Sequence, residues 1–273
     1  MSALFRAIVL AGERPGGGAL ARALQLPAAV LAPLAGRPCL ERVLDTLADA
    51  ERVEGIKVCG PAADVVQSSG ALKSLLARPD VTWLAPQAGP AASALAGARA
   101  WDDYPLLLTA GDHGLLDPAI VDGFCEQAWQ VREAADVVVG LVSHDRVAAA
   151  FPQSRRTVLR FADGAWCGSN LFALLRADAV SALRFWTNVE AQRKRPWRIA
   201  RRLGTWTLLR YALRRLTARQ AFAALSKRAG CRITWVPVHS ARAAVDVDSE
   251  ADWRLADRLL RSDAGSHPAD CAT

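Results

Sequence analysis

The first stretch that could do chemistry is the glycine-rich loop Gly12–Gly18, which follows the apolar run 7–11. A continuous apolar run of this length is typical of a buried strand. A strand that ends in small residues lets backbone N–H groups approach a phosphate chain closely. Arg14, inside the loop, adds a guanidinium that can bind two phosphate oxygens at once. The loop therefore predicts a phosphate-binding turn, with an ordinary surface turn as the alternative.

A carboxylate follows a second apolar run. Residues 105–110 are expected to form a strand, and Gly111, Asp112 and His113 come directly after it. Ligands of open α/β sheets bind at the carboxyl ends of the strands, and Mg²⁺ prefers carboxylate, phosphate and water oxygens. We therefore expect Asp112 to hold a divalent cation, although it could also be a simple turn-forming residue. His113 could contact a phosphate or belong only to the loop.

The elements that must position these residues alternate between strands and helices. Strands apolar on both faces that alternate with helices indicate a mainly parallel sheet covered on both sides. The fold class is therefore α/β, with a three-layer α/β/α sheet, and an antiparallel hairpin is expected after residue 142. Further strands are expected at 55–60, 81–84, 135–142, 157–161, 165–174, 231–238 and 243–247; helices begin near Pro38, Gly89, Pro118 and Ser249, and capping boxes are expected at Thr187–Glu190 and Thr217–Gln220.

The length and composition bound the class of protein. A chain of 273 residues can form one large α/β domain, or a domain with an inserted sub-domain. No apolar run is long enough to cross a bilayer, and the first residues lack the pattern of a secretory signal. The six cysteines are scattered without a Cys-x-x-Cys pair, which is typical of buried thiols in a reducing compartment. We therefore expect a cytoplasmic protein without a cysteine metal site.

The net charge of +7 is concentrated in one part of the chain. Between Arg184 and Arg219 the single acidic residue is Glu190, and the remainder of the chain is slightly acidic. Apolar residues alternate with the basic ones in this block. They could close the small core of a sub-domain, with the arginines as a solvated face, or form an amphipathic surface that rests on anionic lipid. These apolar residues are Trp197, Ile199, Leu203, Trp206, Leu208, Leu209, Leu213 and Leu216.

Residues 8–12, the loop with Arg14, and the run 33–44, which begins Pro-Leu-Ala-Gly-Arg-Pro, together resemble the N-terminal signature of the MobA-like nucleotidyltransferases. The resemblance runs from residue 7 to residue 260 and implies a GT-A-like, Rossmann-like fold. It implies one domain over residues 1–262 with a helical acceptor-side sub-domain over about 150–230, and we expect a disordered tail over 263–273. This chain departs from the family twice in this region, because the family usually has glycine at Glu13 and lysine at Ala29.

The resemblance also implies a reaction: transfer of a nucleotide from an NTP to a phosphorylated acceptor, with release of pyrophosphate. Two anions meet in such a reaction, so it needs Mg²⁺ or Mn²⁺ and cationic side chains. Residues 245–252 resemble the family's Asp-Val-Asp-Thr-Pro-Glu-Asp run. The resemblance thus implies Asp112 and Asp246 as metal ligands, with Asp248 in reserve. One of the two later aspartates could instead cap the last helix with Ser249.

The other implied site residues fall into three groups. Catalysis is assigned to Arg14, Asp112 and Lys194, where Lys194 could supply the cation that is missing at Ala29. Binding of the acceptor is assigned to Gly168, Asn170 and Arg156, although Arg156 could instead be a solvated surface arginine. Binding of the nucleotide is assigned to Leu10, Ala11, Gly12, Arg14, Ser93 and Asp112. Ser93 could instead be a residue at the start of a helix with close packing around it.

Several functions stay open at this stage. The acceptor could be a sugar phosphate, a polyol or lipid head-group phosphate, or molybdopterin. A glycosyltransferase of the related fold is disfavoured, because such enzymes usually carry Asp-x-Asp after a strand and Asp112 is followed by His113 and Gly114. The family usually has proline where this chain has Gly114. This change and those at Glu13 and Ala29 leave open a catalytically impaired homologue that binds a nucleotide or the inner membrane face. No nucleic-acid-binding module is recognised, so we expect no nucleic-acid partner.

Overall fold

The structure is a computed structural model that describes residues 3–13, 17–101, 103–191 and 205–265. Two residues assigned above to catalysis, Arg14 and Lys194, lie outside the described residues, as do Trp197, Ile199 and Leu203 of the basic block. The last eight residues of the expected tail, 266–273, also lie outside them.

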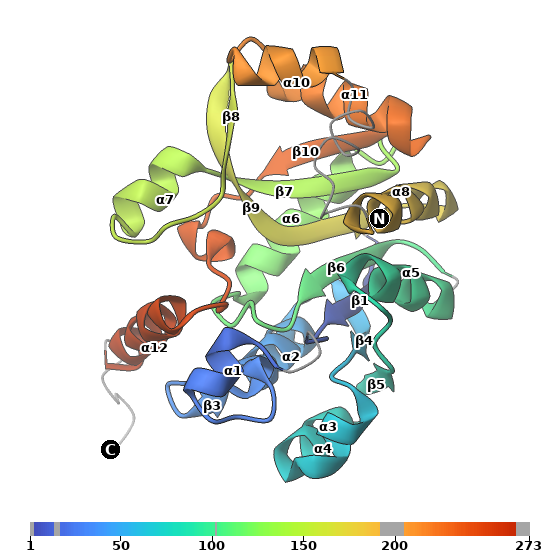
Figure 1. Cartoon of the computed structure of the whole chain (residues 1–273). Helices are drawn as coiled ribbons and strands as arrows, with labels where there is room; N and C mark the ends of the chain where they lie inside the picture. Colours follow the sequence, from blue (N-terminus) through green and yellow to red (C-terminus); the bar gives the residue numbers. More distant parts are fainter. Residues whose placement is uncertain (1–2, 14–16, 102, 192–204, 266–273) are drawn as a thin grey trace, which may run out of the picture.

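An eight-stranded sheet forms the centre of the fold (Figure 1). Strand β9 runs antiparallel to β6, β7 and β8, and the other neighbouring strands pair in parallel. The expected α/β class and mainly parallel sheet are therefore confirmed. The order along the sheet is β10 (Ile233–Pro237), β7 (Val137–Ser143), β9 (Gly164–Leu174), β6 (Leu106–Ala110), β1 (Phe5–Leu10), β4 (Val53–Cys59) and β5 (Val81–Leu84), and β8 (Val158–Phe161) pairs with β9.

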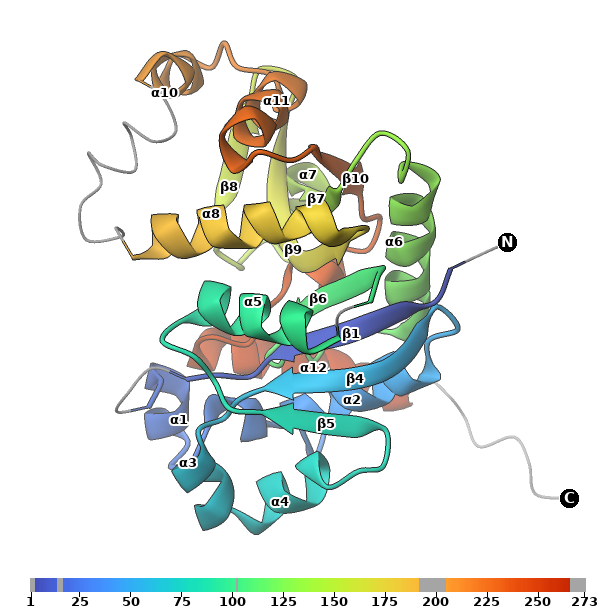
Figure 2. The same ribbon diagram turned by 90° about the vertical axis from the view of Figure 1, so that its right-hand side faces the viewer.

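Helices cover both faces of the sheet (Figure 2). Strand β1 shows why, because side chains of a strand point alternately to opposite faces. Ala7 and Val9 pack in the core that includes α2 (Cys39–Asp49) and α6 (Pro118–Gln130). Ile8 packs in a second core on the opposite face. That second core includes residues of α5 (Pro90–Trp101), α8 (Val180–Glu190) and α11 (Ala218–Ala229).

Shorter elements complete the described part of the chain. The segment expected to form the acceptor-side sub-domain is joined to the central sheet through β9, while its helices lie outside the sheet (Figure 1). None of the helices in the described ranges is long and apolar enough to cross a membrane. The remaining elements are α1 (Ala19–Ala23), β2 (Pro33–Leu34), β3 (Arg37–Pro38), α3 (Ala63–Ser68), α4 (Gly70–Leu76), α7 (His144–Ala150), α10 (Thr205–Ala212), α12 (Glu250–Gly265) and 3₁₀ turns at Ala29–Leu31, Ala177–Ala179 and Ala241–Ala244.

Most helix ends follow the signals in the sequence. The Asp117 carboxylate accepts a hydrogen bond from the Ile120 N–H at 2.8 Å, one residue before Pro118 begins α6. Thr217 and Gln220 form the expected capping box of α11, and α11 ends at Gly230 with φ +73°. Such side-chain acceptors satisfy backbone N–H groups that the first helical turn leaves free.

Three local predictions were wrong. Thr187 lies in the last turns of α8, where its hydroxyl donates to the Leu183 carbonyl, so no helix begins there. Residues 243–247 do not form a strand; a 3₁₀ turn, Ala241–Ala244, precedes an extended stretch outside the sheet. Helix α12 continues to Gly265, past the expected start of the tail, and Asp263 forms an ion pair with Arg242 at 2.7 Å.

Candidate active site

The carboxyl ends of β1, β4 and β6 meet at one edge of the sheet. Leu10 is paired with Cys59 on one side and with Ala110 on the other. The Gly111 N–H donates to the Leu10 carbonyl at 2.8 Å, so the loop after β6 starts beside the loop after β1. Gly60, with φ +97°, packs so closely that a Cβ there would lie 2.7 Å from the Gly12 Cα. The glycine loop and Asp112 are therefore neighbours, as the motifs predict.

Asp112 lies in an environment that opposes its negative charge. Its Oδ1 is buried and has no hydrogen-bond partner in the described part of the chain. Burial, with the nearby carboxylates of Asp248 and Asp246, raises the pKa of Asp112 to about 8. Burial and Asp246 also raise the pKa of Asp248. Asp112, with its buried Oδ1, and the exposed Asp248 thus form an acidic pair at the end of β6, and such a pair fits a divalent metal.

The structure reverses the expected preference for Asp246 over Asp248 as the second metal ligand. The Asp246 carboxylate is held by the Arg156 guanidinium, with Nη1 and Oδ1 at 2.5 Å. The Asp248 carboxylate interacts with Asp112 and has no cationic partner among the described residues, so it is the better candidate for the second ligand. No cluster of three or more acidic, histidine or cysteine side chains able to hold a metal is found within the described ranges. Two carboxylates would suffice for Mg²⁺, which usually completes its shell with phosphates and water.

Arg156 is not a solvated surface arginine. Its side chain is 8 % exposed and pairs with both Asp246 and Asp252. Its Nε also donates to the Ser154 hydroxyl at 2.9 Å. The guanidinium therefore fastens the loop before β8 to the segment that carries Asp248. The acceptor contact proposed for Arg156 stays a prediction, and two carboxylates already use this side chain.

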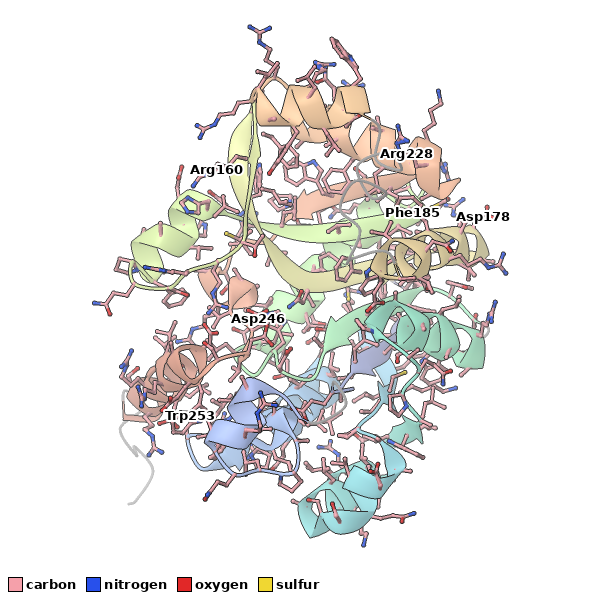
Figure 3. All side chains as sticks on the ribbon, viewed as in Figure 1. Arg160, Asp178, Phe185, Arg228, Asp246 and Trp253 are labelled. Carbon is pink, nitrogen blue, oxygen red and sulfur yellow. The ribbon has the colours of Figure 1, made fainter. Side chains whose placement is uncertain are left out.

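Helix α12 connects the N-terminal signature to the aspartate segment. The Trp253 indole donates to the Pro33 carbonyl at 2.7 Å, and the Ala35 N–H donates to Asp257 at 2.7 Å. The Val247 N–H donates to the Asp112 carbonyl at 3.0 Å. Figure 3 shows the result, with Trp253 on α12 and Asp246 between that helix and the strands. Motifs more than two hundred residues apart in the chain thus share one edge of the fold.

Glu13 has a role that the sequence did not reveal. Its Oε1 accepts hydrogen bonds from the Gly18 N–H at 2.8 Å and from the Ala29 N–H at 3.2 Å. The two departures from the family signature are therefore in contact. In the sequence, this role of Glu13 was indicated by its being a lone acidic residue inside a glycine-rich loop.

His113 and Ser93 are both occupied by structural contacts. His113 is fully buried, and its Nε2 lies 2.8 Å from the Ala243 carbonyl oxygen. Burial lowers the pKa of His113 to about 4, so the ring is neutral and Nε2 carries the proton. The Ser93 hydroxyl accepts a hydrogen bond from the Gln87 N–H at 2.9 Å, which agrees with the packing role considered above. A contact between Ser93 and the nucleotide stays a prediction.

Asn170 lies at the same edge as Asp112. Phe172 pairs with Leu108, and β9 runs antiparallel to β6, so Asn170 falls level with the end of β6. The β7–β9 register shifts between Val139 and Leu141, and Asn170 has a φ of +51°. A bulge with a left-handed residue redirects a side chain, and asparagine tolerates this conformation better than most residues. Gly168, two residues earlier, is exposed opposite Leu141.

A hollow away from the Asp112 site lies between α8 and α11. It has a volume of about 440 Å³ and is lined by Ser181, Arg184, Phe185, Asn188, Arg228 and Ala229. Figure 3 labels Phe185 and Arg228 on these two helices, above Asp246. Its lining has no carboxylate, so it cannot hold a catalytic metal. The strand edge is therefore the better candidate for an active site.

Comparison with known proteins gives a family and a fold. The family model of the MobA-like NTP transferase domain matches residues 7–229. A solved structure described as a hypothetical transferase from Thermus thermophilus is 28 % identical, with a TM-score of 0.74. The alignment covers 92 % of this chain and 99 % of that chain. Among curated proteins, none matches the chain by sequence.

More distant structures share the fold. A 4-diphosphocytidyl-2C-methyl-D-erythritol synthase from Anaerococcus prevotii is 11 % identical with a TM-score of 0.56, over 95 % of this chain and 96 % of that one. A CMP:2-keto-3-deoxy-manno-octonic acid synthetase, solved with CTP, is 12 % identical with a TM-score of 0.57, over 96 % of this chain and all of that one. At these identities the likeness concerns the GT-A-like arrangement of strands and helices.

Proposed function

Because the chain belongs to the MobA-like NTP transferase family, we propose that it transfers a nucleotide from an NTP to a phosphorylated acceptor and releases pyrophosphate. The acceptor class that we propose is a sugar, polyol or lipid head-group phosphate. We place the reaction in the cytoplasm, where NTPs are available. Molybdopterin is a weaker alternative, and no feature of the described residues favours it.

The observation that carries this proposal is the meeting of Asp112 and Asp248 beside the Gly12 loop. The two carboxylates come from segments far apart in the chain, yet they interact at the end of β6, where burial and Asp248 raise the pKa of Asp112. Such a pair suits Mg²⁺ or Mn²⁺. When bound, the cation would neutralise charge on the phosphates.

The chain's own residues would then position two anions. Backbone N–H groups of the loop that begins at Gly12 would face the phosphates, because Gly12 has no side chain to keep a phosphate away from the backbone. An oxygen of the acceptor phosphate attacks the α-phosphorus, and the bond to pyrophosphate breaks. Asn170, level with the end of β6, would hydrogen-bond an acceptor hydroxyl. Catalysis here depends mainly on positioning and charge.

Glu13 supports a second candidate function. Its carboxylate places a negative charge in the loop and binds the Gly18 and Ala29 N–H groups. An anion at this place opposes the binding of phosphates, and no lysine at residue 29 offsets it. The alternative is therefore a homologue that binds a nucleotide weakly and transfers it slowly or not at all.

The test is a pyrophosphate-release screen of the four NTPs with Mg²⁺ against a panel of phosphorylated acceptors. The proposal expects release that depends on acceptor, on metal and on Asp112, with the Asp112→Asn variant as the control. Nucleotide binding without release, for every acceptor that the wild-type protein is given, would favour the second candidate. Release that persists in full without divalent metal would exclude the metal site.

A further inference from the structure

Helix α10 has an apolar face that the described residues of the chain do not cover. Trp206, Leu209 and Leu213 are 69 %, 48 % and 55 % exposed, although they are large hydrophobic side chains. Their spacing places them on one side of a helix. We call these three residues the α10 ridge. Clustered apolar side chains of this size on a surface indicate an interaction site rather than a solvated face.

The opposite side of α10 fixes the helix to the fold, so the ridge cannot be its packing face. The Tyr211 ring contacts Phe161 of β8 edge-on, with ring centres 6.0 Å apart. The Tyr211 hydroxyl accepts a hydrogen bond from the Arg160 N–H at 3.2 Å. Arg210, which lies four residues after Trp206 and so beside the ridge, donates to Gln220 at the start of α11 at 2.9 Å. The expectation that these apolar residues close a sub-domain core is therefore wrong for the ridge, although Leu216 is buried.

The charge around the ridge selects the partner. The sequence has no aspartate or glutamate from Ala191 to Val245. Arg214 and Arg215 follow α10 directly and are exposed. Figure 2 shows α10 at the outer end of the molecule, away from the central sheet.

We propose that the α10 ridge inserts into the interface of an anionic membrane, with Arg214 and Arg215 on the lipid phosphates. Tryptophan and leucine on one face of a basic helix fit the boundary between head groups and acyl chains. Basic residues near an anionic surface each add to binding, and salt weakens their contribution. The contact needs no turnover, so it stands or falls independently of the nucleotidyl transfer.

The experiment is co-sedimentation of the full chain with vesicles. One set contains phosphatidylcholine and phosphatidylglycerol in equal parts, and the other contains phosphatidylcholine alone. The wild-type protein should pellet with the anionic set and remain in the supernatant with the neutral set, and added salt should reduce pelleting. A protein that stays in the supernatant with anionic vesicles at low salt would overturn the proposal.

Matched variants separate the ridge from charge in general. W206S/L213S should weaken vesicle binding about ten-fold or more, since each lost side chain removes buried apolar area. L4S alters an exposed leucine in the N-terminal residues and should bind like wild type. R214E/R215E should weaken binding roughly 25-fold or more, whereas R146E/R258E reverses two exposed arginines on α7 and α12 and should have little effect.

Two results would reassign the ridge. Equal binding of W206S/L213S and wild type would show that other parts of the chain contact the lipid. A lipid-free dimer in sedimentation velocity that W206S/L213S abolishes would make a second copy of this chain the occupant. Both outcomes contradict membrane insertion. Circular dichroism of each variant identifies misfolded samples, and R214E/R215E tests the same surface without altering an apolar side chain.

Discussion

The carboxylate of Glu13 accepts a hydrogen bond from the backbone N–H of Ala29 at 3.2 Å. The same oxygen accepts one from the Gly18 N–H at 2.8 Å. An acidic side chain thus occupies N–H groups that a glycine loop would otherwise offer to a phosphate. The two departures from the family signature therefore touch, because the Glu13 carboxylate binds the backbone of residue 29, from which a lysine side chain would start.

This contact predicts that restoring the lysine alone has little effect. In Ala29→Lys the new ammonium should pair with Glu13 and remain unavailable to phosphates. The double variant E13G/A29K should lower the KM for the NTP roughly 10-fold, the value of one charge-assisted contact. Isothermal titration with the NTP and Mg²⁺ gives the same comparison without turnover. An equal gain in A29K and E13G/A29K would contradict the pairing.

Asp112→Asn should separate activity from stability. The buried carboxylate is destabilised by Asp248 and by its own desolvation. An amide of the same shape removes that repulsion, so the free energy of unfolding without metal should rise by roughly 1–3 kcal/mol. Nucleotidyl transfer should be lost. We expect Mg²⁺ to raise the Tm of the wild-type protein, and D112N should lose this increase. Urea unfolding with and without Mg²⁺ measures both effects, and a less stable D112N without metal would contradict the account.

His113 should make the protein sensitive to mild acid. Its pKa is lowered to about 4 in the folded state by burial, while an unfolded histidine titrates near 6.5. Protons therefore bind the unfolded state first, and stability falls as the pH drops from about 6.5 towards 4. At pH 5 this group should cost about 2 kcal/mol relative to pH 7.5.

The variant His113→Gln tests this pH dependence. Its amide can still donate to the Ala243 carbonyl but does not titrate. The difference in unfolding free energy between wild type and H113Q should shift by about 2 kcal/mol in favour of H113Q from pH 7.5 to pH 5. Parallel stability curves for the two proteins over this range would show that His113 is not the cause.

The sequence predicted the parts of the site that depend on strand ends. Apolar runs followed by Gly12 and by Asp112 indicated two loops at one sheet edge, and pairing of Leu10 with Ala110 places them there. The sequence favoured Asp246 over Asp248 as the second ligand, because it could not show that Asp246 pairs with Arg156, ninety residues away in the chain. Nor could alternation of leucine and arginine show which side of α10 packs on β8. Both answers depend on tertiary contacts that have no local pattern.

Arg156 should be a major support of the aspartate segment. Its guanidinium is mostly buried between Asp246 and Asp252. Arg156→Ala leaves two carboxylates without their counter-charge, which should cost roughly 3–5 kcal/mol of unfolding free energy. R156M/D246N/D252N, which removes the charges together, should recover part of this loss. Arg146→Ala on α7 is the control and should stay within about 0.5 kcal/mol of wild type. Equal stability of R156A and wild type would contradict the proposed support.

Asn170 allows backbone conformation and acceptor binding to be measured separately. At φ +51° an alanine is strained and a glycine is not. Asn170→Ala should therefore lose roughly 1 kcal/mol of stability, whereas Asn170→Gly should stay close to wild type. If the amide binds the acceptor, both variants should raise the acceptor KM roughly 10-fold and leave the KM for the NTP unchanged. A normal acceptor KM in N170G would restrict Asn170 to a structural role in the bulge. Equal stability of N170A and N170G would remove the backbone argument, because the left-handed conformation would then impose no cost on alanine.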